Sequence, residues 1–333
     1  MDAESRRENQ KLRLFSAVTF GMPLLMGIAM AYSYFYHSET SLSAFPLTQM
    51  LYPAAGVMLA YLSDKAMRSE LPKGFFYFYL TFTLLCVIMT LIGSLCGTSN
   101  GIMMELTIIL ATIITYFIFY YTDKSKLKNA GLSYSNCWKK TIGYPILFIV
   151  LSLSIHFLGS FLSGEPMTNG PINKTLILML PLNFLWSFLI YLGEEYGWRF
   201  FLQPILQRRY GNIKGVIMLG ALWGIWHLPL NIFYYNRPDA AIQSILGQLI
   251  VCVCLGIFMG YVYMKTENIW SVVIIHYLQN NLIMILSDGD SVQSLVPWGF
   301  WFLVIVPYCV YLPFLFTKTY RTNDCQTRCR RKT

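Results

Sequence analysis

Residues Gly193 to Tyr210 read GEEYGWRFFLQPILQRRY and place two adjacent glutamates and an arginine at the end of the apolar run Thr175 to Leu192. If the flanking runs are membrane helices, these charges lie at membrane depth. An ionisable side chain is costly there and marks a functional site by default. On a helix, Glu195 and Arg199 are four residues apart and share a face, which favours an ion pair, whereas Glu194 points about 100° away. The stretch therefore predicts a Glu195–Arg199 pair and leaves Glu194 as the carboxylate available for chemistry.

The composition is that of a polytopic membrane protein. Of the 333 residues, 56% are hydrophobic and 12% are charged, against roughly 25% charged residues in an average soluble domain. The mean hydropathy is +0.50. Basic loops on the cytoplasmic side of a membrane explain the net charge of +9 better than nucleic-acid binding does. We therefore expect the lipid bilayer as a partner, and no nucleic acid.

Ten apolar runs of about the length that a bilayer requires follow one another along the chain. They are Leu14–Tyr36, Phe45–Leu62, Phe75–Cys96, Leu106–Tyr121, Ile142–Leu162, Thr175–Leu192, Val216–Phe233, Ile242–Met264, Ile269–Leu286 and Val296–Phe316. With the N-terminus inside, alternation puts 23 of the 25 lysines and arginines in inside segments, as the positive-inside rule requires. The sequence thus predicts an all-α, polytopic transmembrane helix bundle of about ten spans with both termini in the cytoplasm.

A histidine lies inside the run Val216–Phe233, in the string WGIWHLP that ends at Pro229. Gly220 and Gly224 lie on roughly the same helix face as this residue, His227. Small residues on one face let another helix approach closely. We therefore expect a neighbouring helix to pack against this face.

A second histidine, His276, lies four residues before Asn280 in the string HYLQN, so the two side chains face the same way on a helix. At 1.5 Å per residue, Glu194, His227 and His276 each lie about 15 to 20 Å from a basic residue of a predicted inner loop. A glutamate, two histidines and an asparagine at matched depth form a reactive set. This favours a catalytic site over unrelated packing contacts between helices.

Three motifs follow one another on successive helices: Glu194-Glu195-x-x-x-Arg199, Trp223-x-x-x-His227 and His276-x-x-x-Asn280. Together they resemble the CAAX-protease and bacteriocin-processing (CPBP, or Abi) family of intramembrane proteases. The resemblance covers about Leu176 to Leu286, and the second motif departs from the family pattern because it begins with tryptophan where phenylalanine is usual. We expect N-terminal transmembrane helices without a recognised motif over 1–170, a CPBP-like catalytic core over 171–290, and a last transmembrane helix with a basic cytoplasmic tail over 291–333.

The resemblance implies an intramembrane endopeptidase that cleaves a peptide or a prenylated or membrane-associated protein, in a cavity open to the cytoplasm. It assigns the general base to Glu194, aided by His227, and the binding of the oxyanion to His276 and Asn280. Glu195 and Arg199 would hold the helix geometry or contact the substrate. These assignments are chemically sensible, because a medium of low dielectric constant raises the proton affinity of a carboxylate, and hydrogen-bond donors stabilise a developing negative charge.

Two alternatives stay open. Glu194, His227 and His276 could hold a zinc ion with a water molecule in the fourth position. The chain has no His-Glu-x-x-His string, and Asn280 is a poor zinc ligand, so we expect no cofactor and keep zinc as the alternative. The same fold could also serve as a non-catalytic immunity or regulatory membrane protein.

Overall fold

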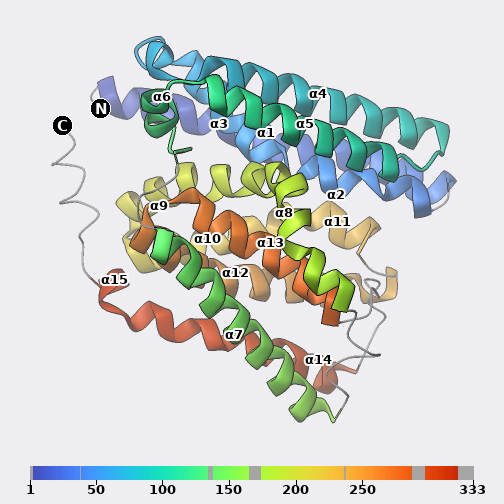
Figure 1. Ribbon diagram of the computed structural model, residues 1–333. Coiled ribbons are helices and arrows are strands. Elements are labelled where there is room, and N and C mark those ends of the chain that lie inside the picture. Colours follow the sequence, from blue (N-terminus) through green and yellow to red (C-terminus); the bar gives the residue numbers. More distant parts are fainter. Residues whose placement is uncertain are drawn as a thin grey trace. The chain divides into compact units, whose positions relative to one another are not determined.

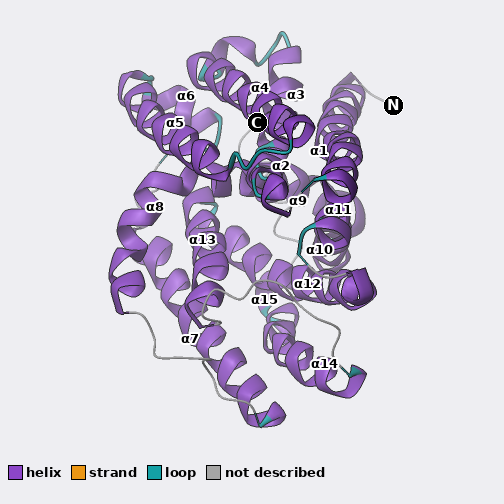
Figure 2. Cartoon of the chain, turned by 90° about the vertical axis from the view of Figure 1, so that its right-hand side faces the viewer, coloured by secondary structure: helices purple, strands orange, loops and turns teal. Residues whose placement is uncertain are grey.

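The computed structural model describes residues 3–37, 39–133, 138–164, 174–235, 238–286 and 297–321. Every regular element in these ranges is helical (Figures 1 and 2), so the prediction of an all-α protein is confirmed for the described part of the chain. The predicted basic tail beyond Arg321 lies outside the described residues.

Six of the described helices are long and apolar enough to cross a membrane. They are Glu4–Tyr36, Lys73–Cys96, Gly101–Tyr121, Lys139–Ser163, Thr175–Tyr210 and Ala241–Thr266. Large apolar side chains cover their outer faces: Leu24, Leu25 and Ile28 are each more than 60% exposed. Such contiguous apolar exposure suits contact with lipid rather than water. These are the features of a multi-pass integral membrane protein, while the count of ten spans and the cytoplasmic location of the termini stay predictions.

The chain forms two compact units, of which unit 1 comprises Met1–Tyr134 and Leu182–Phe200. Its elements are α1 (Ala3–Tyr36), η1 (Glu39–Leu42), α2 (Ala44–Gln49), α3 (Tyr52–Ser63), η2 (Arg68–Glu70), α4 (Lys73–Cys96), α5 (Gly101–Tyr121) and α6 (Lys124–Asn129), with α8 (Lys174–Glu195) from Leu182 onward and the helix η3 (Tyr196–Leu202) up to Phe200. Helix α1 packs along α3 and α4, and α4 packs against α5 (Figure 1). Gly56 permits the close approach of α3 to α1, because a Cβ atom there would lie 3.0 Å from the carbonyl oxygen of Phe15.

Unit 2 comprises Ser135–Pro181 and Phe201–Thr333. Its elements are α7 (Trp138–Ser163), the first turns of α8, α9 (Gln203–Tyr210), α10 (Asn212–Trp226), α11 (Leu228–Phe233), η4 (Pro238–Ala240), α12 (Ala241–Thr266), α13 (Ile269–Leu286), α14 (Trp298–Ile305), η5 (Val306–Phe316) and α15 (Lys318–Arg321). Helix α12 is central to this unit, since it packs against α10, α13 and η5. The Tyr320 hydroxyl donates a 2.6 Å hydrogen bond to the Ile257 carbonyl and ties α15 to α12.

Two of the predicted apolar runs are each interrupted by a turn and form two separate helices, so neither is one continuous helix. Phe45–Leu62 forms α2 and α3, and Val216–Phe233 forms α10 and α11. In both runs a proline, Pro53 or Pro229, lies in the first turn of the second helix. Proline lacks a backbone N–H and disfavours helical backbone at the residue before it. In each run a new helix begins one residue before the proline, at Tyr52 and at Leu228.

Candidate active site

The two glutamates lie in the last turn of α8, where Glu194 is 2% exposed and Glu195 is fully buried. Immediately after them the backbone changes from an α-helix to a π-helix over Tyr196–Leu202. π-Helical segments are rare and occur frequently at functional sites. The sequence predicts an ordinary helix here, because the 3.6-residue turn of an α-helix and the wider turn of a π-helix cannot be distinguished from the pattern of only seven residues.

The predicted ion pair is confirmed. The Arg199 Nε atom donates to Glu195 Oε2 at 2.9 Å, and both side chains are fully buried. A charge removed from water is tolerated when it is paired and hydrogen-bonded. The pair thus brings two charged side chains into the interior of the protein and holds the end of α8 against the first turn of η3.

Aromatic and small residues of unit 1 surround η3. Trp198 is fully buried, with its ring 6.2 Å from that of Phe15 and perpendicular to it. The Tyr196 hydroxyl donates a 2.8 Å hydrogen bond to the Ala130 carbonyl. A Cβ atom at Gly197 would lie 2.9 Å from Pro53 Cα, so only glycine fits between η3 and α3. The π-helix that follows Glu194 is therefore fixed by packing on several sides.

Gly197→Ala is expected to destabilise the protein by about 1–3 kcal/mol, the usual cost of forcing an extra methyl group into a close-packed site. Thermal unfolding of the purified protein measures this change. Gly74→Ala is the matched control in the same unit, because a Cβ atom at Gly74 would meet nothing within 4 Å. Equal unfolding midpoints for the two variants would contradict the tight contact between Gly197 and Pro53.

His227 lies at the break between α10 and α11, as the C-cap of the first helix and the N-cap of the second. It is 7% exposed. Its Nδ1 atom lies 2.8 Å from the Trp223 carbonyl oxygen. A carbonyl oxygen only accepts hydrogen bonds, so Nδ1 carries the hydrogen. When the ring is neutral, Nε2 then has the lone pair, and it can accept a proton or bind a metal ion.

Asn231 and Ser244, which the sequence does not single out, hold His227 in place. The Asn231 side-chain amide donates to the His227 carbonyl at 3.0 Å. The Ser244 hydroxyl, on α12, in turn donates to Asn231 Oδ1 at 2.5 Å. Asn231 follows His227 by four residues, and this spacing was the available signal. Ser244 reaches the site only through tertiary folding, which no local pattern reveals.

The second histidine, His276, lies on α13 and is 4% exposed. The Trp223 ring contacts it edge to face at 5.5 Å between ring centroids and lies 6.1 Å from the ring of His227. One tryptophan thus brings the two histidines of unit 2 into the same neighbourhood. Asn280, one turn further along α13, is exposed.

The first turn of α13 is anchored by Asn268. Its Oδ1 atom accepts a 3.0 Å hydrogen bond from the backbone N–H of Trp270, and its Nδ2 atom donates to Thr141 Oγ1 on α7 at 2.9 Å. A side chain that accepts from the first turn satisfies a backbone donor that the helix itself leaves without an acceptor. The register of α13, and with it the direction of His276, is fixed at this end.

The expected close helix contact beside His227 is confirmed. A Cβ atom at Gly220 would lie 2.6 Å from Val253 Cα, and one at Gly224 would lie 2.8 Å from Leu249 Cα. The partner helix is α12, which packs along α10. Any larger residue at either glycine would push α12 away from α10.

The predicted site residues are divided between the two units. The glutamate pair and Arg199 belong to unit 1, and the two histidines and Asn280 belong to unit 2. The matched depth predicted for the three helices therefore stays a prediction. Within either unit, the described residues contain no group of three His, Cys, Asp or Glu side chains that could hold a metal ion.

The comparisons with known proteins concern the segment that carries the three motifs. Residues 175–282 match the family of type II CAAX prenyl endopeptidases described as Rce1-like. A curated protein of Methanococcus maripaludis, named CAAX prenyl protease 2, is 27% identical to the chain over 179 residues, which is 50% of this chain and 61% of that protein. The chain thus matches less than two thirds of that relative's length. No solved structure matches the chain.

Proposed function

We propose that the chain is an intramembrane endopeptidase and that residues 175–282, which match the Rce1-like family, carry its active site. The observation that supports the proposal most directly is the position of the buried Glu194 within the matched segment. His227, His276 and Asn280 lie in the same segment. A carboxylate can act as a general base, and imidazole and amide groups can donate hydrogen bonds. Peptide hydrolysis needs both kinds of group.

In the proposed reaction Glu194 accepts a proton from a water molecule, whose oxygen attacks the scissile carbonyl carbon. The C–O bond forms as the carbonyl π electrons move onto the carbonyl oxygen. His276 and Asn280 donate hydrogen bonds to this oxyanion. When the oxyanion collapses, the C–N bond breaks and the leaving nitrogen takes the proton from Glu194. No oxidant, reductant or further reactant is needed.

The hydrogen bonding of His227 supports a role as an acceptor in this reaction. Its Nδ1 atom is engaged by the Trp223 carbonyl at 2.8 Å, which leaves the Nε2 lone pair to accept a hydrogen bond from the attacking water. Asn231 and Ser244 act as positioning residues: the Asn231 amide donates to the backbone carbonyl of His227, and Ser244 donates to Asn231 in turn.

The substrate class that we propose is a prenylated or membrane-associated protein, or a peptide, that enters a cavity open to the cytoplasm. The relative named CAAX prenyl protease 2 supports a prenylated substrate. A reporter peptide with a C-terminal CAAX sequence, compared with and without a prenyl group, tests this. Cleavage of the prenylated form alone would support the prenyl substrate, and equal cleavage of both would favour a general peptide substrate.

His227→Ala is expected to lower the cleavage rate by roughly 10²- to 10⁴-fold, the usual contribution of a positioned acid–base group. His276→Ala removes an oxyanion donor and is expected to cost about 10²- to 10³-fold. Asn280→Ala removes the other donor and is expected to cost about 10²-fold, the lower end of that range, because its side chain is exposed to solvent. The measurement is cleavage of the reporter peptide by purified, monodisperse variants.

His156→Ala is the matched control for these variants. His156 lies on α7 and forms the same local interaction as His227, from Nδ1 to the carbonyl oxygen four residues earlier, also at 2.8 Å. Its loss should leave cleavage unchanged. A comparable loss in all three histidine variants would mean that folding, rather than chemistry, explains the effect.

We also propose that the reaction needs no metal ion, with zinc bound by Glu194, His227 and His276 as the alternative. Zinc analysis of the purified protein, with cleavage measured in strong chelator, distinguishes the two. Activity that persists in chelator supports the glutamate mechanism. The metal mechanism would be favoured if the protein contained one zinc ion per chain and lost both the zinc and its activity in chelator. The Glu194 and histidine variants should then lack bound zinc as well. A non-catalytic regulatory role would be favoured if a folded Glu194→Gln variant kept the biological effect.

A further inference from the structure

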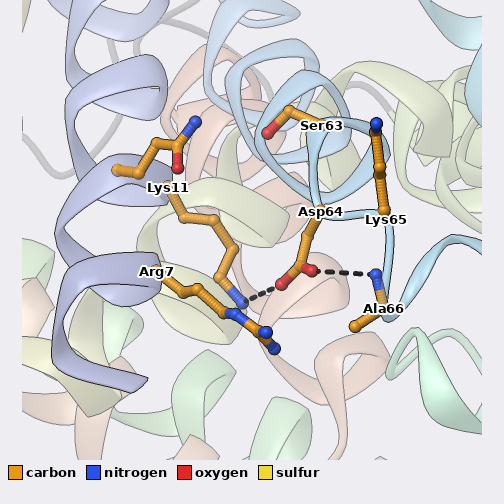
Figure 3. Close-up of a pocket in the computed structure, with 7 residues that line it drawn as sticks. Arg7, Lys11, Ser63, Asp64, Lys65 and Ala66 are labelled. Atoms are coloured by element: carbon orange, nitrogen blue, oxygen red, sulfur yellow. Dashed lines mark hydrogen bonds and ion pairs between the residues drawn. The ribbon is translucent and has the colours of Figure 1, made fainter. Parts of the chain in front are cut away.

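A pocket with an excess of positive charge lies in unit 1, between the first turns of α1 and the end of α3 (Figure 3). Its volume is about 200 Å³, several times the roughly 30 Å³ that one water molecule occupies in the liquid. It is lined by Arg7, Gln10, Lys11, Ser63, Asp64, Lys65 and Ala66. The candidate active site uses none of these residues.

Among the described residues, the ion pair in this pocket is the one between Lys11 and Asp64. Lys11 Nζ donates to Asp64 Oδ2 at 3.2 Å and lies 5.4 Å from the centre of the Tyr61 ring. Asp64 Oδ1 accepts from the backbone N–H of Ala66 at 3.1 Å. Burial alone would raise the pKa of Asp64, but the hydrogen bond from Lys11 and the nearby positive charges lower it. The aspartate is therefore ionised at neutral pH, and the charges of Arg7 and Lys65 remain in excess.

The arrangement of the cations suits an anion with several oxygen atoms. Arg7 and Lys11 are one helical turn apart on α1, and both side chains line the pocket (Figure 3). Like charges at this spacing repel each other. Asp64 offsets the charge of Lys11, and an oxyanion beside Arg7 would relieve the repulsion that remains. A guanidinium group matches phosphate geometry through two parallel N–H···O bonds, which favours phosphate over a simple halide.

The pocket also lies at the right level of the membrane for a lipid headgroup. The apolar run of α1 begins at Leu14, so Lys11 and Arg7 precede it by about 5 and 10 Å along the helix axis. The polar layer on each side of the hydrocarbon core is roughly 5–8 Å thick. Lys11 is thus expected at headgroup depth, and Arg7 just beyond it, where its long side chain can still reach the phosphate group of a phospholipid.

We propose that this pocket binds the phosphate group of an anionic phospholipid. The chemistry would be the same for a soluble phosphate ion, so the test must separate the two sources. This proposal does not depend on the proposed peptidase activity, and either one can be wrong without affecting the other.

The test is calorimetric titration of the purified full-length chain, in neutral detergent, with a short-chain phosphatidylglycerol, a short-chain phosphatidylcholine and inorganic phosphate. Wild-type protein is expected to bind phosphatidylglycerol at least 10-fold more tightly than the other two. The double variant Arg7→Ala/Lys65→Ala is expected to lose about 10-fold or more of that affinity, because each basic residue near a lipid headgroup contributes to its binding. Both side chains are exposed, so the fold should persist, and thermal unfolding checks this.

The matched control is Lys124→Ala/Lys128→Ala, which removes two exposed positive charges from α6, also in unit 1. It should bind phosphatidylglycerol as the wild type does. Equal losses in the two double variants would show general charge attraction and overturn the pocket. Equal binding of phosphatidylglycerol and phosphatidylcholine by the wild type would also overturn it. Equal binding of inorganic phosphate would overturn the lipid as ligand.

Discussion

Glu194→Gln is expected to lower cleavage of the reporter peptide by about 10²- to 10⁴-fold, the range that a positioned general base contributes. Glutamine keeps the size of the side chain and its capacity to form hydrogen bonds, but it cannot accept the proton of the attacking water. Glu194 is 2% exposed at the end of α8, so a substitution that preserves volume should leave the packing around it intact. The expected result is a folded and inactive protein.

The control for this variant is Glu105→Gln. Glu105 lies on α5, and its side chain is exposed, so the same chemical change there should affect neither folding nor cleavage. Circular dichroism and thermal unfolding of both variants establish that the fold is retained. Wild-type cleavage by a folded Glu194→Gln variant would eliminate the glutamate mechanism and remove the main reason to place the chemistry at this residue.

The sequence predicts the long helices of this chain closely. The run Phe75–Cys96 corresponds to α4, Lys73–Cys96, and the run Ile242–Met264 corresponds to α12, Ala241–Thr266. Apolar runs of this length leave few other structures open, because backbone polar groups within a bilayer must be satisfied inside the segment itself. The length and composition of the apolar runs are therefore enough to predict where these helices lie in the sequence.

The irregular parts of the fold depend on tertiary packing, so the pattern of apolar residues does not predict them. Pro53 and Pro229 were visible in the sequence, but an apolar run that contains a proline can either kink or divide, and here both runs divide. The π-helix after Glu195 has no signature in hydrophobic periodicity. Its environment consists of contacts with residues far away in the sequence, such as Pro53 with Gly197.

In the candidate site, too, contacts between residues close in the sequence were predictable and contacts between distant residues were not. The Glu195–Arg199 pair was predictable because four residues separate its members, and the structure confirms it. The role of Trp223 as a common neighbour of His227 and His276 was not predicted, since it requires α10 and α13 to meet. For the same reason Ser244, thirteen residues after Asn231, could not be assigned from the sequence.

Arg199→Met is expected to destabilise the protein by about 3–5 kcal/mol, because it leaves the Glu195 carboxylate buried without its partner. Glu195→Gln should have an effect of similar size, since it strands the guanidinium group. Both side chains are fully buried and 2.9 Å apart, so solvent cannot take over the lost interaction. Thermal and denaturant unfolding of the purified variants measure the change.

The double variant Glu195→Met/Arg199→Met decides whether the pair stabilises the protein or is only costly to break. Replacing a buried ion pair by apolar residues of similar volume is often neutral or stabilising, so the double variant is expected to be more stable than either single one. Lys11→Met breaks the more exposed Lys11–Asp64 pair and should cost about 1 kcal/mol or less.

If the double variant were stable and also fully active, the pair would serve folding alone. If it were stable but inactive, the charges themselves would be needed beside Glu194, and the pair would belong to the catalytic machinery. Single variants as stable as the wild type would contradict the buried pair altogether.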